Sequence, residues 1–127
     1  MTAGTAVHTR RAPEPFGPFV QAVKTDTLVF STGQLPLDPA TGELVSEDVR
    51  IQTRQVLTHL QAILEAAGTS LDRVVKATVF ITDMDDFDKM NAVYAGFFAE
   101  TPPARSCVEV SRLARNAKVE IEVIALL

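Results

Sequence analysis

The sequence has little cysteine, no tryptophan and no long apolar segment. Its one cysteine, Cys107, cannot form an intramolecular disulfide, which is typical of proteins from a reducing compartment. No run of about 18 apolar residues occurs, so a membrane-spanning helix is not expected. The first 15 residues lack the apolar core of a secretory signal. Together these absences predict a cytoplasmic protein without membrane association.

Motifs for metals, nucleotides and nucleic acids are also missing. The sequence has no G-x-G-x-x-G or G-x-x-x-x-G-K-[ST] loop, no H-E-x-x-H and no cysteine–histidine cluster with zinc spacing. We therefore expect neither a metal nor a cofactor. The formal net charge is −4 and the pI about 5.1. Without a clustered basic patch, nucleic-acid binding is not expected either.

The pattern of the 127 residues fits one domain, 1–127, with residues 1–15 as a flexible or extended N-terminal lead. Runs of β-branched and aromatic residues predict strands; these cover 19–23, 27–32, 73–82, 105–110 and 118–126. Helical spacing predicts two helices; they cover about 46–67, ending at Gly68, and about 83–101, ending at Pro102. The order β-β-α-β-α-β-β predicts an α+β, two-layer sandwich with both helices on one face of the sheet.

Alternation along the last predicted strand separates two faces of the sheet. Val119, Ile121 and Val123 point one way, and the intervening residues, among them Glu120 and Leu126, point the other way. With the helices on the first face, the second face mixes carboxylates with large apolar side chains. Such a face is typical of subunit interfaces, so we expect a homo-oligomer.

Arg105, Cys107 and Glu109 share one face of their strand because side chains alternate with a period of two. We expect Arg105 and a glutamate of the next strand to meet on one sheet face. There the guanidinium binds a carboxylate through two parallel hydrogen bonds, and the glutamate holds a water or moves a proton. The alternative is a structural ion pair between Arg105 and Glu120 or Glu122.

Three other residues have both a functional and a structural interpretation. Asn91 falls in an apolar helix stripe, where its amide needs a hydrogen-bond partner from the protein or from a ligand. Gly33 follows a strand and permits a close backbone approach or a positive φ. Cys107 is interpreted as a small buried residue, because His8 lies in the lead and His59 off the main stripe of its helix.

Four segments carry a resemblance to a known family. They are Gly17-Pro18-Phe19-Val20-Gln21-Ala22-Val23, Ser31-Thr32-Gly33-Gln34-Leu35-Pro36, Asn91-Ala92-Val93-Tyr94 with Phe97-Phe98, and Pro103-Ala104-Arg105-Ser106-Cys107-Val108-Glu109-Val110 through Val119-Glu120-Ile121-Glu122. In this order, from about Pro13 to Leu127, the sequence closely resembles the RidA family (YjgF/YER057c/UK114).

The resemblance implies a chorismate-mutase-like subunit and a homotrimer with ligand sites in clefts between subunits. It implies a 2-iminobutanoate/2-iminopropanoate deaminase-type hydrolase, which converts reactive enamines and imines such as 2-aminoacrylate to 2-oxo acids and ammonia. By this resemblance Arg105 is the carboxylate clamp and Glu120 is associated with the catalytic water. The remaining pocket residues would be Phe19, Thr32, Gly33, Asn91 and Cys107.

Two positions depart from the family's pattern. Phe19 stands where the family usually has tyrosine, so the ring is kept and the hydroxyl lost. Thr32 stands for serine and adds a methyl group. The segment between Phe98 and Arg105 is also shorter than in the best-known members. Two alternatives to a deaminase therefore stay open: a non-catalytic, regulatory trimer that binds 2-oxo acids and, less favoured by the acidic charge, an endoribonuclease.

Overall fold

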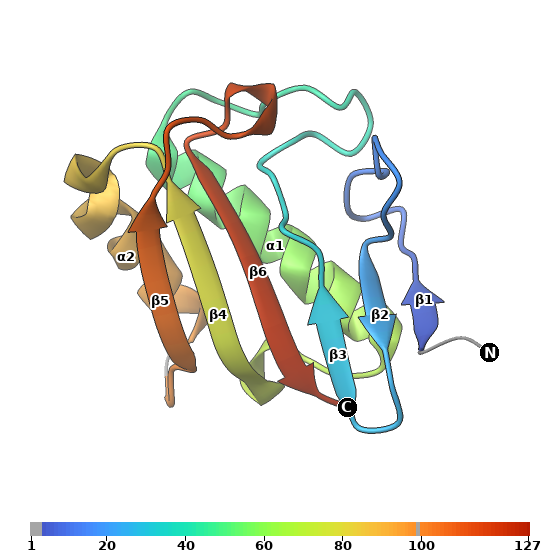
Figure 1. Ribbon diagram of the computed structural model, residues 1–127. Coiled ribbons are helices and arrows are strands. Elements are labelled where there is room, and N and C mark those ends of the chain that lie inside the picture. Colours follow the sequence, from blue (N-terminus) through green and yellow to red (C-terminus); the bar gives the residue numbers. More distant parts are fainter. Residues whose placement is uncertain (1–3, 99) are drawn as a thin grey trace.

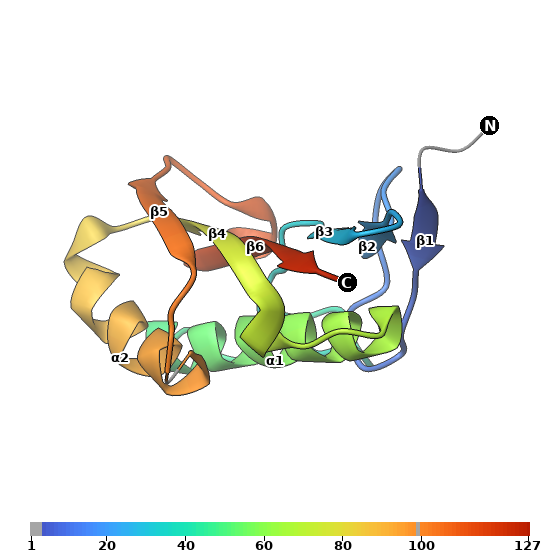
Figure 2. The same ribbon diagram turned by 90° about the horizontal axis from the view of Figure 1, so that it is seen from below.

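Six strands and two helices form two layers in the computed structural model, which describes residues 4–98 and 100–127. The strands are β1 (Thr5–Val7), β2 (Ala22–Lys24), β3 (Leu28–Ser31), β4 (Val74–Ile81), β5 (Ala104–Glu109) and β6 (Val119–Leu126). The helices are α1 (Val49–Ala67) and α2 (Phe87–Phe97). Figure 2 shows both helices beneath one face of the sheet. The predicted α+β sandwich with helices on one face is confirmed.

The strand order is β1-β2-β3-β6-β4-β5, so the last strand of the chain lies inside the sheet (Figure 1). β6 pairs antiparallel with β3 on one side and with β4 on the other. β5 pairs in parallel with β4 and forms an edge of the sheet. Parallel neighbours need a crossover connection, and α2 provides it between β4 and β5. The helix therefore packs beneath the edge that β5 forms.

The core lies between the sheet and α1, as the alternation along β6 predicts. Val119, Ile121 and Val123 of β6 are buried, whereas Glu120 is half-buried and Glu122 is exposed on the opposite face. From α1, the residues that are fully buried in the same core are Val56, Leu57, Leu60, Ile63 and Leu64. Each such side chain contributes about 1.5–3 kcal/mol through burial. Neither described helix is long and apolar enough to cross a bilayer.

The ends of α1 have clear local causes. The Asp48 side chain accepts a hydrogen bond from Arg50 N at 2.8 Å, so the helix begins at Val49, a few residues later than predicted. Gly68 ends it with a φ of 94°, in the left-handed region that glycine tolerates best. His59 lies off the main apolar stripe of α1, but it is nevertheless buried. Its Nε2 donates to Leu37 O at 2.7 Å, because the loop after β3 covers that side of the helix.

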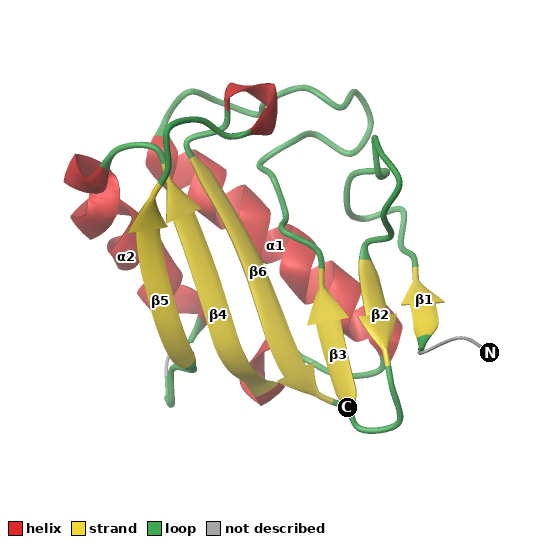
Figure 3. Cartoon of the chain, viewed as in Figure 1, coloured by secondary structure: helices red, strands yellow, loops and turns green. Residues whose placement is uncertain are grey.

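Two loops meet above one end of the sheet (Figure 3). Residues 32–48 connect β3 to α1, and residues 110–118 connect β5 to β6. They pack together through a second, small apolar cluster, formed by Leu35, Leu37, Leu44, Leu113 and Ala117. This contact fixes the positions of both loops relative to β6.

The N-terminal part of the sheet differs from the prediction. β1 was not predicted, and it pairs with β2 to extend the sheet to six strands. Residues 19–23 were predicted as a strand, but β2 begins only at Ala22. Pro18 has no N–H for a ladder, and Phe19 N donates to Gly17 O at 2.8 Å in a tight turn. Phe19 therefore lies in a loop.

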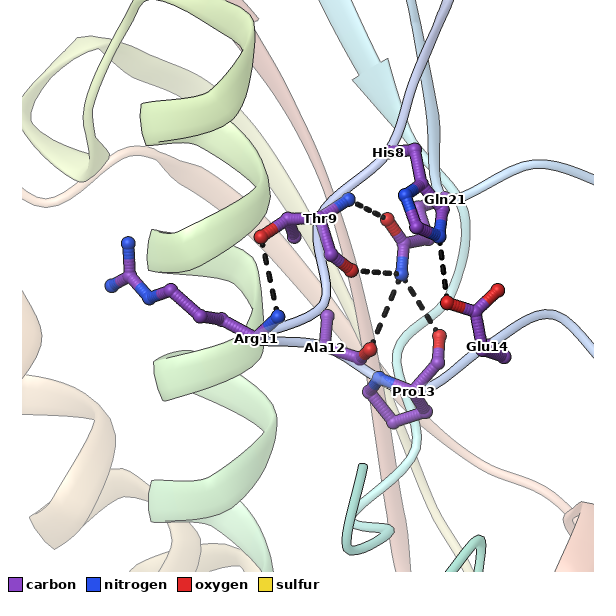
Figure 4. Close-up of polar contacts among 7 residues, drawn as sticks. All are labelled: His8, Thr9, Arg11, Ala12, Pro13, Glu14 and Gln21. Atoms are coloured by element: carbon purple, nitrogen blue, oxygen red, sulfur yellow. Dashed lines mark hydrogen bonds and ion pairs between the residues drawn. The ribbon is translucent and has the colours of Figure 1, made fainter. Parts of the chain in front are cut away.

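Gln21 attaches the N-terminal lead to the sheet (Figure 4). Its side chain is only 1% exposed. The Nε2 group donates to the carbonyls of Thr9 at 3.0 Å, Ala12 at 3.3 Å and Pro13 at 3.0 Å, and Oε1 accepts from Thr9 N at 2.7 Å. The buried Gln21 amide thus takes the place of the backbone hydrogen-bond partners that residues 9–13 lack.

We expect Gln21→Ala to lower the free energy of unfolding by about 2–3 kcal/mol, because several buried backbone groups would lose their partner. Urea denaturation at one fixed protein concentration measures the change. Gln61→Ala is the matched control, because Gln61 is an exposed residue of α1. Equal midpoints for the two variants would contradict this role of Gln21.

Candidate functional site

The predicted site residues fall into two groups on opposite faces of the sheet. Arg105 lies opposite the buried Ala77 of β4 and therefore points to the helix face. Glu120 lies opposite Phe80 and points to the uncovered face. The expectation that Arg105 and Glu120 share a face was wrong, because β4 separates β5 from β6 and the register places the two side chains on different sides.

On the helix face, Arg105 lies against aromatic rings of α2. Its Cζ atom is 4.7 Å from the ring centroid of Tyr94 and 5.6 Å from that of Phe87, and Nη1 is 3.9 Å from the Met90 sulfur. Within residues 4–98 and 100–127, Arg105 forms no ion pair. The alternative of a structural pair with Glu120 or Glu122 within one chain is therefore wrong. The rings orient the guanidinium through cation–π contacts, and no carboxylate of the described residues occupies its N–H groups, which can therefore bind an anion.

Cys107 lies two residues beyond Arg105 on the same strand face. Burial raises the pKa of its thiol, and the nearby Arg105 guanidinium offsets only part of that effect. Both histidines are engaged elsewhere, since His8 pairs with Glu14 and His59 with Leu37. Cys107 is partly buried and packs against the main core, so its interpretation as a small packing residue holds, although it is less buried than predicted.

Two buried polar atoms of α2 have no partner among the described residues. They are Oδ1 of Asn91 and the hydroxyl of Tyr94, both buried on α2. Tyr94 was placed in the apolar stripe of the helix and was not recognised as a site residue. The feature that could have identified Tyr94 was its hydroxyl, since a buried tyrosine usually finds a hydrogen-bond partner. These two atoms are enclosed by the chain, and among Arg105, Asn91 and Tyr94 it is Arg105 whose half-buried guanidinium can meet a ligand or another chain.

On the uncovered face, Glu120 lines a cavity of about 250 Å³. The other lining residues are Pro13, Phe16, Phe19, Thr32, Gly33, Gln34, Leu35, Leu37 and Ala114. The structure thus brings Phe19, Thr32, Gly33 and Glu120 together, as the resemblance implies. Phe16 was missed, although it directly precedes the Gly17-Pro18 turn that places Phe19 in the cavity wall.

The backbone at Gly33 lies against the Glu120 carboxylate. A Cβ atom at position 33 would overlap a carboxylate oxygen and lie 2.8 Å from the carboxylate carbon. A bridge between Gln34 and Ile121 fixes this approach, with Gln34 N donating to Ile121 O at 2.8 Å. Of the two roles predicted for Gly33, the close approach is the one observed, because positive φ occurs at Gly42 and Gly68 instead.

Burial raises the pKa of Glu120, and the neighbouring carboxylate of Glu122 raises it further. A carboxyl group with a raised pKa exchanges a proton near neutral pH more readily than an ordinary glutamate does. In the part of the chain that the structure describes, no cluster of three or more histidine, cysteine, aspartate or glutamate residues is arranged to bind a metal ion. The chemistry of this half of the site therefore centres on one carboxyl group beside an apolar wall.

Comparison with known proteins adds to this geometry. A protein-family model described as Endoribonuclease L-PSP matches residues 9–127. A RutC family protein of Pyrococcus horikoshii is 55% identical over 94% of each chain, and a 2-iminobutanoate/2-iminopropanoate deaminase of Salmonella typhimurium is 50% identical over 94% of this chain and 95% of the relative. The crystal structure of Escherichia coli TdcF with bound serine is similar at a TM-score of 0.93 and 47% identity, over 97% of each chain. Similarity to solved structures of this kind confirms the expected chorismate-mutase-like fold of the subunit.

We expect Gly33→Ala to push the Glu120 carboxylate into solvent, because the added methyl group occupies its place. The pKa of Glu120 should then fall toward its ordinary value of 4.5, since the burial that raises it is lost. Carboxyl-carbon chemical shifts followed over a pH titration measure the change. Gly96→Ala is the control, because a Cβ atom there meets nothing within 4 Å. An unchanged Glu120 pKa in Gly33→Ala would contradict the predicted displacement.

Proposed function

The chain belongs to the RidA/YjgF family, and we propose that it hydrolyses reactive imines and enamines of 2-amino acids to 2-oxo acids and ammonia. The observation that carries this proposal is the state of Arg105. Its guanidinium is held by the rings of Phe87 and Tyr94 and has no carboxylate partner in the described chain. A half-buried cation without a counter-ion is a site for an anion, and a substrate carboxylate fits its planar fork.

The substrate would bind between two copies of the chain. Arg105 and Glu120 lie on opposite faces of one sheet, so one copy presents each of them on a different side. The uncovered face also exposes large apolar side chains, among them Phe30, Val108 and Leu126. Covering them with a second copy removes this apolar area from water. We propose a homotrimer in which Arg105 of one copy faces Glu120 of the next, with a complete site at each interface.

In this arrangement each group has a defined task. Arg105 holds the substrate carboxylate, so that the planar imine carbon faces a water beside Glu120. The Glu120 carboxylate accepts a proton from the water as the water oxygen bonds to the carbon of the protonated imine, which gives a neutral tetrahedral carbinolamine. The carboxyl group then returns this proton to the amino nitrogen. As the C–N bond breaks and the C=O bond forms, the carbinolamine hydroxyl gives its proton to the Glu120 carboxylate, and ammonia and a 2-oxo acid leave. Since free imines already hydrolyse in water, lowering the barrier by about 1.4 kcal/mol gives a tenfold acceleration.

The other site residues shape the pocket around these two groups. Asn91 and Cys107 would contact the substrate on the Arg105 side, and Thr32 and Gly33 on the Glu120 side. Phe19 packs a ring against the substrate without supplying a hydroxyl. Escherichia coli TdcF was crystallised with serine, a ligand with the α-carboxylate that Arg105 would bind here.

A non-catalytic trimer that binds 2-oxo acids uses the same cleft. It differs in one measurable respect, since it binds the acid and turns over no imine. Endoribonuclease activity appears in the description of the family model. The net charge of −4 and the single carboxyl group in the apolar cavity do not favour RNA binding.

Arg105→Ala and Glu120→Gln should each lower imine hydrolysis by about 100-fold, because the first loses the carboxylate contact and the second the proton acceptor. The assay generates imines with an amino-acid oxidase and measures how far the protein suppresses semicarbazone formation. Arg112→Ala is the control, because it removes the same charge from an exposed position beyond β5. Full activity of Arg105→Ala would rule out the clamp. Tight binding of 2-oxo acids by an inactive wild type would favour the binding protein.

Mixing the two inactive variants tests whether the site is shared between copies. In a mixed trimer, one of the three interfaces joins the intact Arg105 of one copy to the intact Glu120 of another. Random mixing makes about three trimers in four mixed, so we expect roughly a quarter of wild-type activity after co-expression or co-refolding. Separate samples combined without subunit exchange are the control. If the co-expressed variants recover no activity, both groups act within a single chain or not at all.

A further inference from the structure

Two neighbouring phenylalanines form an exposed aromatic wall beside Glu120. The rings of Phe16 and Phe19 meet edge to face, with centroids 5.6 Å apart and planes at 87°. They are 46% and 41% exposed, although both line the cavity that contains Glu120. Aromatic side chains that are this exposed at the mouth of a cavity are typical of ligand contacts, because their flat faces can pack against a ligand.

Arg115 fixes the outer ring of this wall. Its Cζ atom lies 4.5 Å from the ring centroid of Phe16. The backbone of Arg115 is left-handed, with φ of 62° and ψ of 20°, and Asn116 follows with φ of 59°. Two consecutive non-glycine residues in this region are uncommon, and such conformations cluster at functional sites. The turn holds the Arg115 guanidinium over Phe16 and leaves the small Ala114 at the cavity.

We propose that Arg115, Phe16 and Phe19 form a side-chain subsite that selects imino acids with apolar and, above all, aromatic side chains. This inference rests on the proposed function, since it assumes that the reacting carbon lies beside Glu120. In the cavity lining, Glu120 is the charged residue, and the rest of the wall is aromatic, aliphatic or neutral. Arg115 contacts the ring of Phe16 but does not line the cavity, so a second substrate carboxylate inside the cavity would face Glu120 and be repelled.

The cavity also limits the size of the side chain. Its volume of about 250 Å³ lies below the roughly 300–1,000 Å³ of sites for drug-sized ligands. Pro13, Leu35 and Leu37 belong to its lining, and the buried amide of Gln21 donates to the Pro13 carbonyl and so fixes the position of that residue. The subsite therefore accepts one amino-acid side chain and excludes a longer peptide or polymer.

The test compares the hydrolysis of imines derived from alanine, leucine, phenylalanine and glutamate. For the wild type we expect kcat/KM to be highest with the phenylalanine-derived imine and lowest with the glutamate-derived imine. Phe16→Ala should lower the phenylalanine-to-alanine ratio of kcat/KM about tenfold. Phe16→Leu should keep the preference for leucine and lose the preference for phenylalanine. Arg115→Ala should reduce the ratio less than Phe16→Ala, and Arg112→Ala should leave it unchanged.

The binding of the product 2-oxo acids, measured by calorimetry, separates this inference from the proposed function. If the wild type hydrolyses no imine but binds the phenylalanine-derived 2-oxo acid most tightly, and Phe16→Ala removes that preference, deamination fails and the subsite stands. If Phe16→Ala lowers kcat/KM by the same factor for all substrates, or if the glutamate-derived compounds are preferred, the proposed subsite is overturned. Melting temperatures and oligomeric states of all variants ensure that the comparison is made on folded protein.

Discussion

The alternation of side chains along β6 is the constraint on which the rest of the molecule depends. The strand lies inside the sheet and pairs with β3 and β4, so its position is fixed from both sides. Val119, Ile121 and Val123 close the core against α1, and the same periodicity turns Glu120 to the uncovered face. A slip of one residue would bury two carboxylates and expose the core. The fold therefore fixes the side of the sheet on which Glu120 can act.

Local patterns were sufficient to predict most elements and several site neighbours. The apolar stripe and Gly68 predicted α1, and alternation predicted which residues of β6 face the helices. The resemblance placed Phe19, Thr32, Gly33 and Glu120 in one pocket, and the structure brings them together. These features depend on side-chain spacing or on short motifs, both of which are visible in the sequence alone.

The features that could not be predicted depend on contacts between distant parts of the chain. Nothing in β5 indicates that it pairs in parallel with β4 and not with β6, yet this pairing puts Arg105 on the helix face of the sheet, away from the face that carries Glu120. His59 is buried because a loop from another part of the sequence covers it. The three residues of β1 are too few for a strand pattern. The contact of Arg115 with Phe16 requires a left-handed backbone that arginine seldom adopts.

The separation of Arg105 and Glu120 on opposite faces has a consequence for symmetry. A two-fold contact uses the same patch on both copies, so it matches Arg105 with Glu120 only if one patch contains both residues, and their placement on opposite faces of the sheet opposes that. A head-to-tail contact joins unlike surfaces and matches each Arg105 with a Glu120. Repeated once per copy, such a contact either closes into a ring or continues as an open filament whose two ends each hold an unmatched half-site. A closed ring is thus the arrangement in which both the Arg105 face and the Glu120 face of every copy are matched.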